Sequence, residues 1–416
     1  MGELVYLLST RAFFLLTKLI APLNKRARLL VAGQKGLLKK IIDFSDPHGK
    51  QSIWFHVASL GEYEQGRPIM EAMKVAYPEC RLVVTFFSPS GYENKKQDPL
   101  MDAVFYLPFE SRKNAKLVVE CLNPKMAVWI KYDLWYYYLK ALKDNSTPIY
   151  LCAAQFREGQ RFFNPYASFH KKLIRLFDFY FCQNHESQDL LKSIGIENSI
   201  VTGDNRYDRV YQSLLHAESL PVIESFKEAS FLLIAGSSYE EEEELLLYAL
   251  ENASKKVKLI IAPHFVDPKR LAQIQNKFGS GIVLYSDLLK QPDLSKQPIL
   301  LIDSIGLLAK IYRYGNASLI GGGFWENGLH NTLEAVTFGM PLCFGPKIKR
   351  FPEAKELIHE GIAEIISDKN SFSTWLNHLL DEPDYCSEIA GKSRSFVKNN
   401  LGATQMVLDK IKELNP

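Results

Sequence analysis

Short apolar runs alternate with segments of helical period from residue 53 to residue 344, and this alternation limits the fold more than any other feature. Parallel strands need a crossover connection, usually a helix, so the pattern predicts parallel, doubly wound sheets with helices on both faces. The expected strands are 53–57, 82–86, 103–107, 126–130, 149–153, 179–182 and 200–202, then 231–235, 259–262, 282–285, 299–302, 317–320 and 341–344.

The alternation weakens between residues 203 and 230, around Pro221, and then restarts. A chain of 416 residues also exceeds what one hydrophobic core usually supports. We therefore expect an α/β protein with two Rossmann-like domains facing across a cleft, where doubly wound folds bind ligands at the carboxyl ends of their strands. The expected parts are an N-terminal segment over 1–40, domains over 41–215 and 222–400, and a helix over 401–416 returning to the first domain.

Composition excludes several classes of function. The net charge of +3 is too small to indicate nucleic-acid binding, and the 25 Phe and 20 Tyr spread across expected strands rather than forming base-stacking clusters. The six cysteines contain no CxxC pair, which favours reduced cysteines over a disulfide framework or a zinc site. We expect no nucleic-acid partner and no cofactor.

The N-terminus is the compositional exception. Residues 3–23 are largely apolar but carry Arg11 and Lys18, and basic residues follow from Lys25 onward. A signal peptide is not expected, because a small-residue cleavage site is missing. A charge at the centre of a spanning helix costs about 2.5–3.5 kcal/mol, so we expect a helix lying in the membrane interface with its basic residues on anionic lipid. A single-pass anchor, or an amphipathic helix packed on the protein's own core, are the alternatives.

The first candidate site follows the first expected strand, at Ser59, Gly61 and Glu62. Gly61 permits close approach of a backbone or ligand, and Glu62 lies where a carboxylate can take a proton from an attacking hydroxyl. The spacing of Ser59 and Glu62 is also that of a capping box, which simply closes a helix start. The two interpretations are compatible.

The second candidate site lies in residues 317–346, where an apolar run ends in three glycines that include Gly322 and Gly323. A helix is expected to begin near Asn331, and its free N–H groups and positive dipole end suit a phosphate. Glu334 is positioned to accept hydrogen bonds from a ribose diol. The Asn331–Glu334 spacing is again that of a helix cap, so both readings stay open.

Basic groups that suit a phosphate form the third candidate, at His264 and Arg270 near the end of an expected strand. Residues 236–238, at another strand end, suggest a weaker anion seat. The chain lacks GxGxxG after its first strand, GxxxxGK[ST], HExxH and GxSxG. No DxD-type pair of acids is placed to hold a metal-bound diphosphate, which favours a transfer reaction without a metal.

Together these motifs resemble the transferases of 3-deoxy-D-manno-octulosonic acid (Kdo), which add this sugar to the lipid A precursor in Gram-negative bacteria. Residues 321–346, GGGFWENGLHNTLEAVTFGMPLCFGP, are similar to the family's GGS-to-HNxLE-to-GP block. Residues 54–62, WFHVASLGE, look like its W-I-H-A-x-S-x-G-E motif. Weaker similarity covers residues 85–93 and 202–208, so the resemblance extends over nearly the whole chain.

The resemblance implies a GT-B fold that binds the acceptor in its N-terminal half and CMP-Kdo in its C-terminal half. It implies an inverting, metal-independent transfer of Kdo to lipid IVA with Glu62 as general base. His330, Asn331 and Glu334 belong to the CMP site, and we expect Ser59, Gly61, His264, Arg270, Gly322 and Gly323 to bind the donor as well. The protein would lie at the cytoplasmic face of the inner membrane, held through residues 1–30, with its oligomeric state left open.

The chain departs from the family pattern at several positions. Lys131 stands where the family has an acid, Tyr136 replaces a proline, no basic residue precedes His264, and Leu329 replaces a glycine. These departures concern the acceptor more than the donor. Two alternatives remain from the sequence, namely another GT-B transferase or epimerase using a UDP-sugar, and a catalytically idle membrane-attached binding protein.

Overall fold

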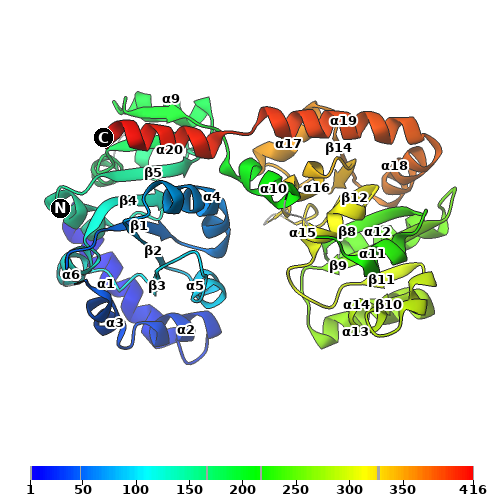
Figure 1. Ribbon diagram of the computed structural model, residues 1–416, viewed down its shortest axis with the longest axis horizontal. Helices are drawn as coiled ribbons and strands as arrows, with labels where there is room; N and C mark the ends of the chain where they lie inside the picture. The colour runs from blue at the N-terminus through cyan, green and yellow to red at the C-terminus, as the bar shows by residue number, and fades with distance from the viewer. Residues whose placement is uncertain (1, 47, 165–166, 216–217, 326–327, 416) are drawn as a thin grey trace. The chain divides into compact units, whose positions relative to one another are not determined.

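The computed structural model describes residues 2–46, 48–164, 167–215, 218–325 and 328–415. The chain divides into two compact units (Figure 1). Unit 1 comprises Met1–Arg209 together with Leu401–Pro416, and unit 2 comprises Val210–Asn400. Each unit is built on one parallel sheet.

Unit 1 contains a seven-stranded sheet in the order β3-β2-β1-β4-β5-β6-β7. Its faces belong to two hydrophobic clusters, because successive side chains of a strand point to opposite faces. Trp54 packs in one cluster, and its neighbours Ile53 and Phe55 pack in the other. The strands are β1 (Ser52–Val57), β2 (Arg81–Phe86), β3 (Ala103–Tyr106), β4 (Pro124–Ile130), β5 (Ile149–Ala154), β6 (Phe179–Cys182) and β7 (Ser199–Val201).

Helices connect these strands and cover both faces of the sheet (Figure 1). Their starts follow side-chain caps in several places; Ser59, Ser88 and Ser111, for example, each accept a backbone N–H from the first turn. The connecting helices are α4 (Leu60–Ala76), α5 (Pro89–Lys95), α6 (Arg112–Leu122), α7 (Tyr136–Asp144), α8 (Ser168–Ile174), α9 (His185–Ser193) and α10 (Asn205–Leu215).

Unit 2 contains a second seven-stranded parallel sheet in the order β10-β11-β9-β8-β12-β13-β14. Its strands are β8 (Phe231–Ser238), β9 (Val257–Pro263), β10 (Ile282–Leu284), β11 (Ile299–Leu301), β12 (Ala317–Ile320), β13 (Leu342–Phe344) and β14 (Ala363–Ile365). Its helices are α11 (Pro221–Lys227), α12 (Glu240–Glu251), α13 (Pro268–Phe278), α14 (Tyr285–Leu288), α15 (Leu308–Ile311), α16 (Leu333–Thr337), α17 (Pro352–His359), α18 (Lys369–Asp381) and α19 (Pro383–Asn399).

The prediction of two parallel-sheet Rossmann-like domains is confirmed. Every expected strand is present, but β14 was not among the expected strands. Only Ala363 of its three residues is buried, so it has no apolar run to mark it. The main switch points of the strand order lie between β1 and β4 in unit 1 and between β8 and β12 in unit 2. Doubly wound folds bind their ligands at such switch points.

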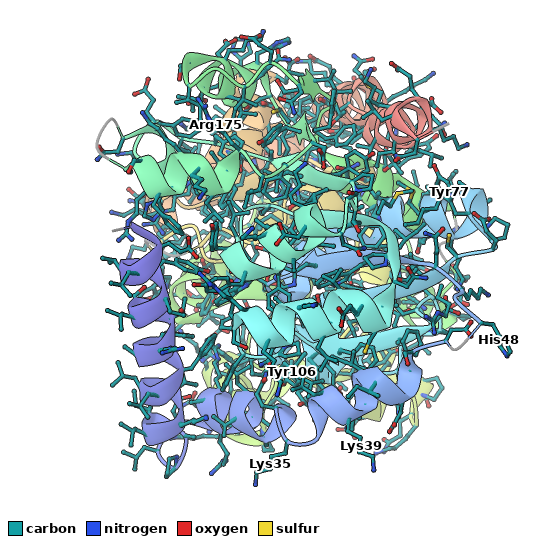
Figure 2. All side chains as sticks on the ribbon, turned by 90° about the vertical axis from the view of Figure 1, so that its left-hand side faces the viewer. Lys35, Lys39, His48, Tyr77, Tyr106 and Arg175 are labelled. Carbon is teal, nitrogen blue, oxygen red and sulfur yellow. The ribbon has the colours of Figure 1, made fainter. Side chains whose placement is uncertain are left out.

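Three helices precede the first sheet, α1 (Gly2–Ile20), α2 (Lys25–Gly33) and α3 (Leu37–Phe44). Figure 2 shows α1 as a rod along one side of unit 1, with Lys35 and Lys39 directed outward along the adjoining edge. Within the described residues, no single helix is long and apolar enough to cross a membrane. The pair α1 and α2, bent by 114°, meets the length and composition requirement together.

The C-terminal helix α20 (Ala403–Leu414) packs in unit 1, where Val407 and Ile411 join the core beside β6. Its N-cap is Gly402, which has no side chain to satisfy the free N–H groups of the first turn. Asp208 supplies that cap from a distant part of the sequence. Its carboxylate accepts hydrogen bonds from the N–H groups of Gly402 at 2.8 Å and Thr404 at 2.7 Å.

Candidate functional site

Glu62 lies in the first turn of α4, directly beyond the carboxyl end of β1. Its N–H donates to Ser59 Oγ at 3.4 Å, and its own Oε2 accepts the N–H of Ala58 at 2.5 Å. Both groups therefore close the start of α4, as a capping interaction requires. Gly61 beside them is exposed, and an added Cβ there would meet only Ser59 Oγ at 4.0 Å. The space over Gly61 is open to a ligand.

The pKa of Glu62 is raised, first because burial disfavours the charged carboxylate. The N–H of Ala58 lowers the pKa, the negative charge of Asp133 raises it, and the neighbouring Lys131 and His56 lower it. A carboxyl group with a raised pKa is a stronger base once ionised, which is the property that general-base catalysis uses. The Ala58 N–H, Lys131 and His56 oppose the effect of burial and so favour the ionised form of Glu62.

A second carboxylate, that of Asp133, lies within the charge environment of Glu62, in the loop between β4 and α7. Asp133 Oδ2 accepts the indole N–H of Trp135 at 3.0 Å and lies 3.2 Å from Nε2 of the fully buried His56. The main-chain oxygen of Asp133 accepts the indole N–H of Trp129 at 3.0 Å. Neither His56 nor Asp133 was among the predicted site residues. A histidine inside the apolar run of β1 is the sequence signal that would have marked this network.

Strained backbone lies near the carboxyl ends of strands in both sheets. Lys131, just after β4, has φ of 62°, and Ala153 near the end of β5 has φ of 54°. Ser237, near the end of β8 in unit 2, has φ of 55°. Non-glycine residues avoid this left-handed region, and their presence at functional edges is a recurrent feature of proteins.

In unit 2 the predicted glycine turn follows β12, at the switch point of the second sheet. Close backbone packing explains why these positions are glycine. A Cβ on Gly322, whose φ is +86°, would lie 2.0 Å from the carbonyl oxygen of Gly328, and one on Gly323 would lie 2.5 Å from Gly345 N. The N–H of Gly322 donates to Glu242 Oε1 at 2.8 Å. The carboxylate of Glu242 thus already accepts one backbone N–H of the glycine turn, where the sequence suggested that a phosphate would bind.

The helix expected near Asn331 begins two residues later, as α16 at Leu333, and has five residues. Asn331 stays outside because its Oδ1 accepts the N–H of Leu333 at 3.1 Å, forming a turn before the helix. Its Nδ2 donates to Glu334 Oε1 at 3.0 Å. The structure therefore brings Asn331 and Glu334 together. Residues 326 and 327 of the quoted motif lie outside the described residues.

Three aromatic rings meet beside this turn. His330 stacks on Tyr239 with ring centroids 5.7 Å apart, and His264 lies 4.5 Å from His330 and 5.0 Å from Tyr239. The hydroxyl of Tyr239 is 3.1 Å from His330 Nε2. Burial lowers the pKa of His330 to about 4, with a further contribution from His264, and burial also lowers the pKa of His264. Both imidazoles are therefore neutral near pH 7, and Tyr239 is a member of the cluster that sequence reasoning missed.

Arg270 lies on α13 and is committed to an ion pair. Its guanidinium contacts Oε1 of the fully buried Glu243 on α12 at 2.5 Å. The structure therefore places Arg270 on a helix-to-helix contact, whereas His264 and His330 touch each other at the strand ends. Two buried hydroxyls at the same edge, those of Ser238 and Thr332, have no hydrogen-bond partner among the described residues. Such hydroxyls suit a polar ligand.

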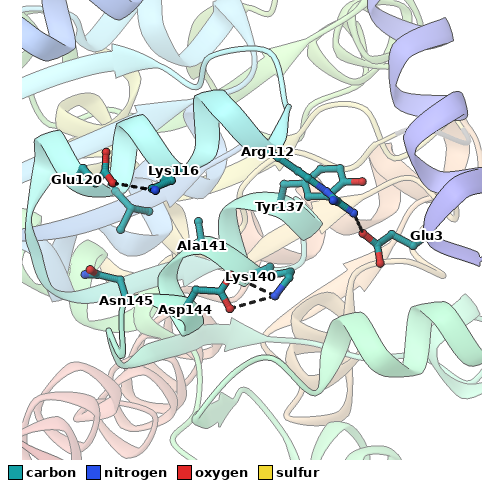
Figure 3. Close-up of a pocket in the computed structure, with 10 residues that line it drawn as sticks. Glu3, Arg112, Lys116, Glu120, Tyr137, Lys140, Ala141, Asp144 and Asn145 are labelled. Carbon is teal, nitrogen blue, oxygen red and sulfur yellow. Dashed lines mark hydrogen bonds and ion pairs between the residues drawn. The ribbon is translucent and has the colours of Figure 1, made fainter.

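Within the described ranges, no group of three or more His, Cys, Asp or Glu is placed to hold an ion. A surface cavity of about 600 Å³ lies between α1, α6 and α7, and neither Glu62 nor Asp133 lines it (Figure 3). Its charges pair with one another, as Arg112 does with Glu3 at 2.6 Å and Lys116 with Glu120 at 3.7 Å. It therefore offers no unbalanced charge to a ligand.

Comparison with known proteins shows a likeness to one family of transferases. A model of the family described as 3-deoxy-D-manno-octulosonic-acid transferase (kdotransferase) matches residues 31–209. A 3-deoxy-D-manno-octulosonic acid transferase of Chlamydophila psittaci is 24% identical over 371 residues, covering 87% of this chain and 85% of that protein. The transferase of the same description from Haemophilus influenzae is 25% identical over 386 residues, covering 87% of each.

Among solved structures, the UDP-GlcNAc 2-epimerase from Neisseria meningitidis bound to UDP-GlcNAc matches with a TM-score of 0.62 at 16% identity. The match covers 87% of this chain and 100% of that one, and it shows the fold alone. The region that the family model matches contains the motif at β1. The two relatives match over most of the chain. This chain is similar to the Kdo transferases, by the family model over residues 31–209 and by the two relatives over most of its length, and it is a glycosyltransferase.

Proposed function

We propose that this glycosyltransferase moves Kdo from CMP-Kdo to a lipid A precursor, lipid IVA, with inversion at the sugar carbon and without a metal. The observation that carries the proposal is Glu62, a half-buried carboxylate with a raised pKa at the switch point of unit 1. It stands at the position of the family's SxGE glutamate. Both curated relatives compared above are described as Kdo transferases.

In the proposed reaction, Glu62 takes the proton from a sugar hydroxyl of the acceptor. The hydroxyl oxygen forms a bond to the anomeric carbon of Kdo as the bond from that carbon to the phosphate oxygen of CMP breaks. CMP leaves with the electron pair, and the proton remains on Glu62 until solvent removes it. One base and one displacement are sufficient for inversion.

The donor half of the proposal rests on unit 2. We assign CMP-Kdo to the edge formed by the ends of β8, β9 and β12, where His264, His330 and Tyr239 meet. Neutral imidazoles offer both a donor and an acceptor nitrogen, which suits the polar groups of a nucleotide. The unpartnered hydroxyls of Ser238 and Thr332 add further polar groups to this edge. Asn331 and Glu334 complete the assignment by their position in the family's HNxLE block.

We also propose that residues 1–30 hold the protein at the cytoplasmic face of the inner membrane. One face of α1 packs on unit 1 through Thr10 and Phe14, while many of its large apolar side chains are exposed. Such a surface, beside exposed Arg11, Lys18 and Lys25, fits an interfacial helix on anionic lipid. The exposed large apolar residues are Leu4, Val5, Leu8, Phe13, Leu15, Leu16, Leu19, Ile20 and Leu23.

Thermal unfolding of the full chain with CMP or UDP tests the donor assignment. The proposal expects CMP to raise the melting temperature, because a ligand that binds only the folded state stabilises it. His330→Ala should lose most of this increase, and His359→Ala, an exposed histidine on α17, should keep it. Protection by UDP alone would favour the alternative of a transferase or epimerase that uses a UDP-sugar.

Catalysis is tested separately with Glu62→Gln, which keeps the shape of the side chain and its ability to accept the Ala58 N–H. A loss of turnover of at least a hundredfold is expected from removal of a general base. Glu64→Gln is the matched control on the same helix, because Glu64 pairs with Lys95 at 2.7 Å and is not part of the proposed site. Near-normal turnover of Glu62→Gln, with an intact fold, would make the base assignment wrong.

A further inference from the structure

An aromatic ring of the N-terminal helix packs against the loop that carries Asp133. Phe14 of α1 is 7% exposed and stacks on Phe109 with centroids 4.2 Å apart and planes 18° apart. Its ring is also stacked relative to Trp135, at 6.0 Å and 20°. Trp135 contacts Phe87 from the loop after β2, at 4.9 Å. The indole is therefore held between α1 and the end of the sheet.

The other side of the same indole is polar. Its N–H donates to Oδ2 of Asp133 at 3.0 Å, and this oxygen is the one that faces His56 Nε2 at 3.2 Å. The backbone of Asp133 is fixed independently, because its carbonyl accepts the N–H of Trp129. The direction of the Asp133 side chain therefore depends on Trp135 and His56, whereas the path of the loop does not.

We propose that Trp135 is a positioning residue for the transfer reaction, which keeps the carboxylate of Asp133 directed toward His56, within the charge environment of Glu62, while α1 is seated on unit 1. The physical reason is the double role of an indole, whose ring is fixed by packing and whose N–H needs a partner when desolvated. If Phe14 leaves, the ring loses one side of its packing and can rotate away from Asp133. This inference rests on the proposed function of Glu62 as the base.

The consequence for Glu62 is electrostatic. The groups that act on its carboxylate are the Ala58 N–H, Asp133, Lys131 and His56, and the carboxylate in turn acts on the phenol of Tyr132. Of the charged neighbours, Asp133 has the largest effect, and it raises the pKa of Glu62. A carboxylate of Asp133 that turns away would let the pKa of Glu62 fall. The base would then stay ionised to lower pH but would be a weaker base.

The test measures kcat, KM for CMP-Kdo and the pH profile of Trp135→Phe, which keeps an aromatic ring and removes the N–H. We expect kcat to fall about tenfold, as for loss of one hydrogen bond to a charged group. KM for CMP-Kdo should not change, and the acid limb of the kcat profile should move to lower pH. Asp133→Asn should move the acid limb in the same direction.

The part played by α1 is tested with Phe14→Leu, which replaces the stacked ring and leaves Glu62 and Asp133 unchanged. It should lower kcat and move the acid limb as Trp135→Phe does, and the double variant should be no worse than Trp135→Phe alone. Leu15→Ala is the matched control, because Leu15 is 60% exposed on the same helix. Assays in detergent micelles keep changes in membrane affinity out of the comparison.

The outcomes separate the inference from the proposed function. If Glu62→Gln is inactive while Trp135→Phe and Phe14→Leu keep the wild-type kcat and acid limb, the positioning role is wrong and the base assignment stands. If Glu62→Gln remains active, the base assignment itself fails. Near-ultraviolet circular dichroism of each variant establishes the fold, and a parallel rise in KM for CMP-Kdo would also contradict the proposal, since it would indicate general damage.

Discussion

The apolar surface of α1 gives a prediction whose size follows from the structure. Leu8, Leu15 and Leu19 are 56%, 60% and 65% exposed, so each would bury a little over half of its side chain in a membrane interface. Full burial of a leucine side chain is worth about 1.5–3 kcal/mol, which leaves about 1 kcal/mol for each of these three. Replacing all three by serine should therefore weaken membrane partitioning by about 3 kcal/mol, or roughly a hundredfold.

The assay is flotation of the full chain with lipid vesicles that contain an anionic phospholipid, with the partition coefficient read from the bound fraction. The triple variant should keep the wild-type melting temperature, because none of these residues is part of the core. The matched control replaces Val75, Leu289 and Ile305 by serine, which are 81%, 52% and 89% exposed outside α1. Equal loss of binding in the control, or unchanged binding of the α1 variant, would refute the reasoning.

Three further predictions concern stability and the donor. Asp208→Ala removes the only side-chain cap seen at the start of α20 among the described residues, and should lower the free energy of unfolding in urea by about 1–2 kcal/mol, whereas Asp208→Asn should cost less. Burial raises the pKa of Glu110 to about 7, so the folded protein binds its proton more tightly than the unfolded chain, and stability should fall by about 3 kcal/mol from pH 5 to pH 8. Glu110→Gln should remove that part of the pH slope, and an unchanged slope would contradict the assignment. Tyr239→Phe frees His330 Nε2 and should reduce thermal protection by CMP without changing the urea midpoint of the ligand-free protein.

Much of the fold follows from local sequence, because each buried parallel strand is an apolar run that local composition reveals. The strand β14 was missed because two of its three residues are exposed and it is paired only at the sheet edge. The start of α16 was displaced because Asn331 bonds to the N–H of Leu333 and forms a turn rather than a cap. The sequence could not show which backbone N–H the Asn331 side-chain oxygen would accept, and that choice sets where the helix begins.

The candidate site was predictable only in part. Glu62 and His330 stand in local motifs, and the structure places both at switch points of their sheets. Asp133, His56 and Tyr239 were missed because their significance comes from contacts between residues far apart in sequence. His56 and Asp133 are 77 positions apart, and Tyr239 and His330 are 91 apart. Arg270 looked like a phosphate ligand by its charge, and the buried Glu243 that neutralises it lies on another helix.

The central claim is that this chain joins Kdo to a lipid A precursor with Glu62 as the base. Its most direct test incubates the purified full chain with lipid IVA and CMP-Kdo generated in the same vessel, and weighs the lipid product by mass spectrometry. The account predicts a product heavier than the acceptor by one or more Kdo residues, formed by the wild type and by Glu64→Gln but not by Glu62→Gln. An unchanged acceptor with active wild-type protein on a UDP-sugar, or full product formation by Glu62→Gln, would contradict it.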